Sequence, residues 1–376
     1  MEGKTPLVRR SDGPAVEEET TVSDPMAGIR RWLDVMSPEY RGKNTRRMQG
    51  YQKLPITSRE RRLASLGDAP VQLDRLAQVA LKSELHSNET VLYLGYGSNM
   101  SAETFRGRRN IKPISQINAV IPQLSLTFDL PGVPYYEPCF GNVRYRRPTE
   151  LDEKGAPWPP YHKDQWPKGL VGIVYEVTKA DFAHIIATEG GGAAYQDVLV
   201  DCYALEEDPH EKVPLEPEGA TFKAHTLFCP PNVSRPDPSY AQASPRYLKL
   251  ITDGAEEHDL PYEYQEFLKS IGTYRPTTTK QRLGQFIFLA IWAPIFIFIF
   301  GGAGMFLDKD GRYPKWYARF AMATFAACWG SYDDFFKTAF GDGERTIEKR
   351  DAEGSTVSEK EGLIRYHGRD YGVAVS

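Results

Sequence analysis

The sequence has few cysteines and no pattern that binds a metal. Its 376 residues include four cysteines, all far apart and without a Cys-x-x-Cys pair, and none of its seven histidines is spaced i, i+4 from another. These absences exclude a disulfide framework and a zinc site. We therefore expect a reduced, intracellular protein that holds no metal.

Two further features are missing. Lys and Arg number 46 against 50 Asp and Glu, a net charge of -4, so the chain lacks the basic excess that grips nucleic-acid phosphates. No apolar stretch follows Met1, so we expect no secretory signal peptide. Residues 1–87 are rich in charge, Pro, Ser and Gly, which predicts a largely disordered region with a short helix over 69–86.

One segment contrasts with the mean hydropathy of -0.48. Residues 285–306 carry no charge and one polar side chain. At about 1.5 Å per residue they are long enough to cross the hydrocarbon core of about 30 Å, which predicts a transmembrane helix, with a buried core helix as the alternative. Residues 312–340 include Arg319 and are expected to lie at the membrane interface or to form half of a hairpin, followed by a disordered tail at 341–376.

The middle of the chain, 88–279, has the character of one folded domain. Strands are expected at Thr90–Leu94, Leu124–Leu130, Leu170–Val177, Val198–Leu205 and Phe222–Phe228, and helices at Thr178–Thr188, Pro245–Ile251 and Pro261–Ile271. Because strands and helices do not alternate regularly, the pattern predicts a mixed, partly antiparallel α+β fold. The proline-rich stretch Glu137–Gly169 is unsuited to a central strand and is interpreted as a lid or as a loop facing a partner or membrane.

Two motifs in this domain can carry chemistry. The first predicted strand runs into Gly-Tyr-Gly-Ser-Asn at 95–99, a tight turn whose backbone N–H groups can bind a carboxylate or oxyanion. It lacks the third glycine of a dinucleotide site and the Gly-Lys-Ser/Thr of a phosphate loop, and the alternative is an ordinary strand-end turn. Glu189 precedes three glycines and is a candidate base, the alternative being an exposed residue at a helix C-cap.

A third stretch makes a family resemblance specific. Ser-Pro-Arg-Tyr at 244–247, followed by Leu-Pro-Tyr-Glu-Tyr-Gln at 260–265, resembles two segments of the γ-glutamylcyclotransferase family, in the same order after the glycine turn and Glu189. These motifs cover about half of the chain. The hydrophobic extension after Pro276 is similar to that of a fungal, membrane-tethered subgroup.

The resemblance implies a γ-glutamylcyclotransferase-like mixed β-barrel with flanking helices, and it assigns the site residues. The substrate loop would comprise Tyr93, Leu94, Gly95, Tyr96, Gly97 and Ser98, with Asn99 buttressing the turn. Glu189 would be the general base and Tyr247 would line the pocket. The family commonly has alanine where Gly95 stands, and the triple glycine alters the spacing to Tyr195, which is left unassigned.

The activity that the resemblance implies is a lyase reaction without metal or organic cofactor. The α-amine of a γ-glutamyl group attacks its own γ-carbonyl, giving 5-oxoproline and releasing an amino acid or amine. Two alternatives stay open: removal of γ-glutamyl groups from glutathione conjugates in sulfur-containing secondary metabolism, and a non-catalytic membrane module. We expect a single-pass membrane protein with its catalytic domain in the cytosol, where γ-glutamyl compounds are made.

Overall fold

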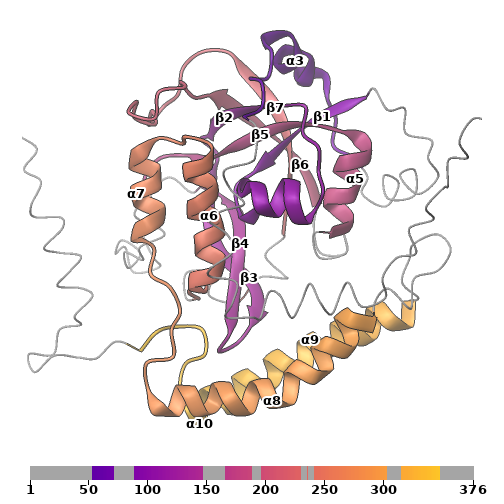
Figure 1. Ribbon diagram of the computed structural model, residues 1–376, viewed down its shortest axis with the longest axis vertical. Coiled ribbons are helices and arrows are strands. Elements are labelled where there is room, and N and C mark those ends of the chain that lie inside the picture. The colour runs from indigo at the N-terminus through magenta and orange to yellow at the C-terminus, as the bar shows by residue number, and fades with distance from the viewer. Residues whose placement is uncertain are drawn as a thin grey trace, which may run out of the picture.

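The computed structural model describes residues 53–71, 89–146, 166–188, 196–229, 235, 241–302 and 315–347. Its centre is a sheet of β1 (Thr90–Gly95), β2 (Ser115–Ile121), β5 (Leu170–Thr178), β6 (Gln196–Ala204) and β7 (Thr221–Phe228). The strands pair in the order β1-β5-β2-β6-β7, all antiparallel (Figure 1). A parallel pairing between Tyr93 of β1 and His225 of β7 closes the sheet.

Strands β3 (Leu124–Val133) and β4 (Glu137–Tyr145) form a separate two-stranded ribbon that extends from the sheet toward the C-terminal helices (Figure 1). Residues 137–145 belong to the stretch that was interpreted as a lid or loop, and they form a strand instead; it is an edge strand, in agreement with the expectation that this stretch is unsuited to a central strand. Pro138 is tolerated because β4 pairs with β3 alone, and proline is compatible with edge strands. Residues 147–165 of the predicted insertion lie outside the described residues.

The domain also contains the short π-helix η4 (Glu103–Arg108) and the helices α5 (Lys179–Thr188), α6 (Pro245–Glu257) and α7 (Tyr262–Ser270). Helix α6 begins where the Ser244 hydroxyl accepts a hydrogen bond from the Tyr247 amide, with Pro245 at the first position. The apolar faces of the helices and the sheet share one hydrophobic core. The mixed α+β class is confirmed.

The segment before β1 is ordered from Lys53 to Val71, in contrast to the disorder expected there. It contains α3 (Arg59–Ala64) and the turn η2 (Ser65–Gly67). The Arg61 guanidinium donates to the Thr90 hydroxyl at 3.0 Å and lies 3.4 Å from the Glu176 carboxylate. An arginine cluster that resembles a solvated tail is therefore fixed to the sheet, while the helix predicted over 69–86 lies mostly outside the described residues.

The C-terminal helices α8 (Thr279–Gly302) and α9 (Lys315–Ser331) lie alongside each other (Figure 1). Helix α8 begins six residues before the predicted start at 285, and Thr279–Ile299 is long and apolar enough to cross a membrane. After α9 the chain continues through η9 (Tyr332–Phe336) and α10 (Lys337–Phe340). Residues 341–347, expected to begin a disordered tail, instead follow a defined path against the body.

Candidate active site

The glycine turn follows β1 directly and is fixed from both sides. Its last part forms the 3₁₀ turn η3 (Ser98–Met100), closed by the Met100 amide donating to the Gly97 carbonyl at 3.0 Å. The Tyr96 hydroxyl donates to the Leu227 carbonyl at 3.1 Å, and the Thr226 hydroxyl donates to the Leu94 carbonyl at 3.3 Å. Strand β7 thus holds the turn at the end of the sheet.

A buried hydrogen bond joins the strand to the turn. The Asn99 side-chain amide donates to the Tyr93 hydroxyl at 2.8 Å. The Tyr93 ring stacks on Phe105, which stacks in turn on Tyr175 with ring centroids 4.4 Å apart. This aromatic layer is rigid support for the turn, since all three rings are buried.

Glycines allow two elements, β5 and α6, to approach the turn at backbone distance. A Cβ built on Gly172 of β5 would lie 2.6 Å from the Gly95 carbonyl oxygen, and one built on Gly254 of α6 would lie 2.5 Å from the Met100 carbonyl carbon. A Cβ on Gly95 itself would lie 3.3 Å from the Tyr175 ring, a tight but less severe contact. Helix α6 and strand β5 therefore pack directly on the backbone of the turn.

Tyr247 contacts both the β3–β4 ribbon and the glycine turn. Its hydroxyl oxygen accepts a hydrogen bond from the Gly141 amide of β4 at 3.0 Å and lies 3.2 Å from the position of a Cβ on Gly97. The Phe140 ring packs edge-on against Tyr247 at 5.1 Å. The contribution of β4 to the site through the Gly141 amide was not predicted from the sequence. A glycine within a strand often marks the close approach of another group, and Gly141 is such a residue.

The start of α6 is anchored on the same strand by a buried carboxylate. Glu137 accepts hydrogen bonds from the Ser244 hydroxyl and from the Arg246 guanidinium. Its side chain is 5% exposed, so the pairing with Arg246 compensates a charge that would be costly to bury alone. This contact fixes the first turn of α6 and hence Tyr247.

Two titratable residues lie behind the turn, at the far end of α6. The Glu257 carboxylate accepts a hydrogen bond from the Ala102 amide at 2.6 Å, and burial raises the pKa of Glu257 to about 7. The His258 ring bridges the Gln116 amide and the Tyr175 hydroxyl, at 2.9 and 3.1 Å, and burial lowers the pKa of His258 to about 4. Both groups support the turn from its inner side.

The structure thus gathers most of the predicted site residues at one end of the sheet. They are Tyr93, Leu94, Gly95, Tyr96, Gly97, Ser98, Asn99 and Tyr247. The predicted base, Glu189, lies outside the described residues, which resume at Gln196 in β6. Within the described ranges no group of three or more His, Cys, Asp or Glu side chains is placed to hold a metal ion.

No family model matches the sequence. The γ-glutamyl cyclotransferase aclK of Aspergillus oryzae is 31% identical over 276 residues, covering 70% of this chain and 93% of that protein. The γ-glutamyl cyclotransferase gliK of Aspergillus fumigatus is 28% identical over 261 residues, covering 68% of this chain and 89% of that protein. A solved γ-glutamyl cyclotransferase structure aligns with 53% of this chain and 99% of its own at 20% identity, with a TM-score of 0.35.

Proposed function

The chain belongs to the γ-glutamyl cyclotransferase family, and from that premise we propose that it converts a γ-glutamyl substrate into 5-oxoproline and a released amino acid or amine. The observation that carries this proposal is the position of the glycine turn beneath Tyr247, pinned to β7 and packed on α6. A rigid, glycine-lined turn suits the task of holding one small substrate in a fixed conformation.

The strand directions support Glu189 as the base. Strands β1 and β7 run parallel, so Gly95 and Phe228 end at the same edge of the sheet. Gln196, the first residue of β6, pairs with Phe228, and the neighbouring Leu227 carbonyl accepts the Tyr96 hydroxyl. The segment that carries Glu189 therefore leads into β6 at the edge where the glycine turn lies.

The proposed reaction needs one proton acceptor and no water. The substrate α-ammonium gives a proton to Glu189, and the free amine attacks the γ-carbonyl carbon. The new C–N bond closes the five-membered ring, and Glu189 returns its proton to the leaving nitrogen as the original amide C–N bond breaks. The second proton of the attacking nitrogen passes to the released amine, which leaves as an ammonium ion. Backbone N–H groups of the turn would hold the substrate in this folded conformation, and well-oriented intramolecular reactions reach effective molarities of about 10⁵ to 10⁸ M.

The base assignment is tested with the Glu189→Gln variant of the full-length protein. Glutamine is nearly isosteric but takes no proton, so 5-oxoproline formation should fall by about 10² to 10⁴ with unchanged thermal stability. The matched control is Glu207→Gln, the same change on an exposed turn after β6, which should keep wild-type activity. Retention of more than about a tenth of the activity by Glu189→Gln would rule out the assignment.

Substrate choice is a separate question with two candidates. The resemblance to a fungal subgroup favours either γ-glutamyl dipeptides or γ-glutamyl groups on glutathione conjugates. Relatives that cleave glutathione itself usually have leucine where Asn99 stands and lack the Leu-Pro-x-Glu-Tyr-Gln segment at 260–265. Incubation with a γ-glutamyl dipeptide, glutathione and a glutathione S-conjugate separates these substrates, and no 5-oxoproline from any of them would favour the non-catalytic module.

We propose further that the C-terminal helices attach the protein to a membrane, with the catalytic domain facing the cytosol. The length and apolar composition of Thr279–Ile299 support attachment. The cytosolic orientation is supported by the substrate class, because γ-glutamyl peptides are made there. Fractionation of cells that express the full-length chain tests attachment independently of activity.

A further inference from the structure

The chain returns to the catalytic domain after the helix pair. The Arg275 amide, before α8, donates to the Thr346 hydroxyl at 2.8 Å, and that hydroxyl donates to the Thr273 carbonyl at 2.9 Å. The Thr277 hydroxyl donates to the Ile347 carbonyl at 2.6 Å. The segments that enter and leave the helix pair are therefore in direct contact and must lie on the same side of any membrane, which is incompatible with a single pass.

A partly buried ion-pair cluster adds to the contacts that hold the returning segment against the domain. The Arg235 guanidinium donates to Asp333 at 2.8 and 2.9 Å and to Glu344 at 2.9 and 3.0 Å. It also lies 4.0 Å from the centre of the Trp329 ring. The Arg235 amide donates to the Asp129 carbonyl of β3, so the cluster joins the end of α9 to the ribbon beside the candidate site.

The length of the uncharged stretch in α9 indicates whether α8 and α9 can both cross the membrane. The uncharged stretch between Arg319 and Asp333 has 13 residues, Phe320 to Tyr332. At about 1.5 Å per residue it covers roughly 20 Å, short of the hydrocarbon core of about 30 Å. Uncharged segments of about 10 to 14 residues are typical of interfacial or re-entrant helices rather than of spanning ones.

The orientation of α8 and α9 relative to the catalytic domain also favours a position along the membrane plane. Figure 1 shows α8 and α9 running beneath the catalytic domain, along its lower side, instead of pointing directly away from it. A pair standing perpendicular to a bilayer would carry part of that domain into the hydrocarbon. A pair lying along the membrane plane leaves the domain in water.

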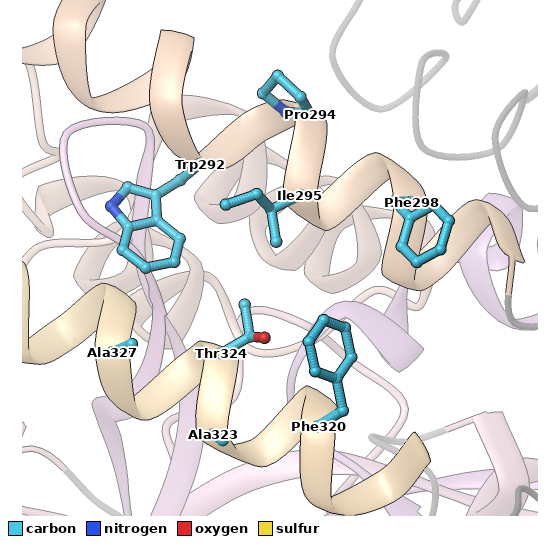
Figure 2. A pocket seen from close by; sticks show the side chains of 8 residues that line it. All are labelled: Trp292, Pro294, Ile295, Phe298, Phe320, Ala323, Thr324 and Ala327. Carbon is cyan, nitrogen blue, oxygen red and sulfur yellow. The ribbon is translucent and has the colours of Figure 1, made fainter. Parts of the chain in front are cut away.

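The surface of the pair is apolar where lipid would meet it. Helix α8 exposes Leu283, Phe286, Ile291 and Phe298, with Phe286 72% and Phe298 62% exposed. These positions are spaced three, five and seven residues apart, which places them on one broad side of the helix. A groove of about 590 Å³ lies between the helices (Figure 2), lined by Trp292, Pro294, Ile295, Phe298, Phe320, Ala323, Thr324 and Ala327.

We propose that α8 and α9 form a monotopic hairpin that embeds in a single membrane leaflet without crossing it. The occupant of the groove and of the α8 face is the acyl-chain region of that leaflet, and residues 303–314 stay on the same side as the catalytic domain. Arg319, exposed one turn before Ala323, sits where it can reach a lipid phosphate. The proposal rests on the membrane attachment proposed above but not on the catalytic activity.

Cysteine accessibility tests the topology. The four native cysteines are buried, so cysteines introduced in the full-length chain provide the reactive thiols. In sealed vesicles with the catalytic domain outside, Glu207→Cys on the domain surface and Asp310→Cys between the helices are treated with a membrane-impermeant maleimide. We expect both to be labelled before detergent is added. Labelling of Asp310→Cys only after detergent, with Glu207→Cys labelled at once, would establish two crossings and overturn the proposal.

The lipid contact is tested with Phe298→Glu, which puts a charge on the exposed apolar face. The variant should move largely from the membrane pellet to the supernatant while keeping its 5-oxoproline-forming rate, and Leu215→Glu, at an exposed site on the domain, should stay membrane-bound. A Phe298→Glu protein that remains in the membrane pellet would contradict the proposal that this face contacts lipid. The proposal would also fail if the variant stays membrane-bound and size-exclusion chromatography shows only a change from dimer to monomer, because the face would then contact a second copy of the chain. Because activity is measured separately, failure of the catalytic proposal is distinguishable from failure of this one.

Discussion

The hydroxyl oxygen of Tyr247 accepts a hydrogen bond from the Gly141 amide at 3.0 Å, in a part-buried position. This contact joins helix α6 to strand β4, and the same oxygen reaches the position that a side chain at Gly97 would occupy. One phenol group therefore sets the distance between the ribbon, the helix and the glycine turn.

Tyr247→Phe removes that group and leaves the Gly141 amide without this acceptor. An unpaired buried donor costs about 1 to 3 kcal/mol, so the free energy of unfolding should fall by that amount. The glycine turn also loses its contact with the Tyr247 hydroxyl beside Gly97. KM for the γ-glutamyl substrate should therefore rise several-fold, while kcat changes less. Urea denaturation and steady-state kinetics measure both effects. Tyr145→Phe, on an exposed ring of the same ribbon, is the control, and equal behaviour of the two variants would refute the role of Tyr247.

Gly254 permits the closest approach of α6 to the turn. In Gly254→Ala the new methyl would meet the Met100 backbone at 2.5 Å, so α6 must shift and stability should fall by about 1 to 3 kcal/mol, with a loss of activity. Gly330→Ala is the same change in α9, where a Cβ meets nothing within 4 Å, and it should be neutral or stabilising by up to about 1 kcal/mol. Thermal unfolding of the two variants side by side decides the matter, and a Gly254→Ala protein as stable as wild type would show that the contact is not tight.

The Glu257 carboxyl predicts a pH-dependent contribution to stability. Burial raises the pKa of Glu257 from 4.5 to about 7, so between these pH values the folded state binds more protons than the unfolded state. Its contribution is present below about pH 4.5 and is lost as the pH rises through about 7. Glu257→Gln keeps an acceptor for the Ala102 amide but does not ionise, so its stability relative to wild type should increase from pH 5 to pH 8.

Denaturant titrations at several pH values measure the difference in free energy of unfolding between Glu257→Gln and wild type. His258 has the opposite dependence, because burial lowers the pKa of His258 from 6.5 to about 4 and stability is lost as the pH falls through that range. The comparison is therefore made between the variant and wild type at each pH, where the histidine contribution cancels. A constant difference from pH 5 to pH 8 would mean that Glu257 ionises normally in the folded protein.

The ion pair between Arg235 and Glu344 predicts strong coupling between the helix pair and the catalytic domain. Glu344 is 1% exposed, so Arg235→Met leaves its carboxylate buried without its main partner, a loss of about 3 to 5 kcal/mol. Adding Glu344→Gln removes the uncompensated charge and should restore part of that loss. A double-mutant cycle by thermal unfolding measures the coupling, and additive effects of the two changes would contradict it.

Much of the sheet could be predicted because its strands are continuous apolar runs. The run from Thr90 to Leu94 ends in a glycine turn, and the predicted strands at 170–177 and 222–228 match β5 and β7 to within one residue. Strand β4 escaped prediction because Pro138 and Gly141 disfavour a strand locally, whereas pairing with β3 overrides this preference. Strand β2 lies between Pro113 and Pro122 and was also missed, although it pairs with both β5 and β6.

The two ordered terminal segments could not be predicted from composition. Residues 53–67 are rich in arginine, a composition typical of a solvated tail, yet Arg61 finds Thr90 and Glu176 on the sheet. Residues 341–347 are equally polar, and their order depends on Arg235 and on residues before α8 that are about 70 to 110 positions away in sequence. Such long-range polar pairs leave no local periodicity in the sequence.

The central claim, cyclisation rather than hydrolysis, is tested most directly by the products formed from one γ-glutamyl dipeptide. The purified full-length protein is incubated with the dipeptide in water enriched in oxygen-18, and the products are quantified by mass spectrometry. The account predicts 5-oxoproline and the released amino acid in equal amounts, without free glutamate and without incorporation of the heavy isotope. Release of oxygen-18-labelled glutamate in place of 5-oxoproline would contradict it.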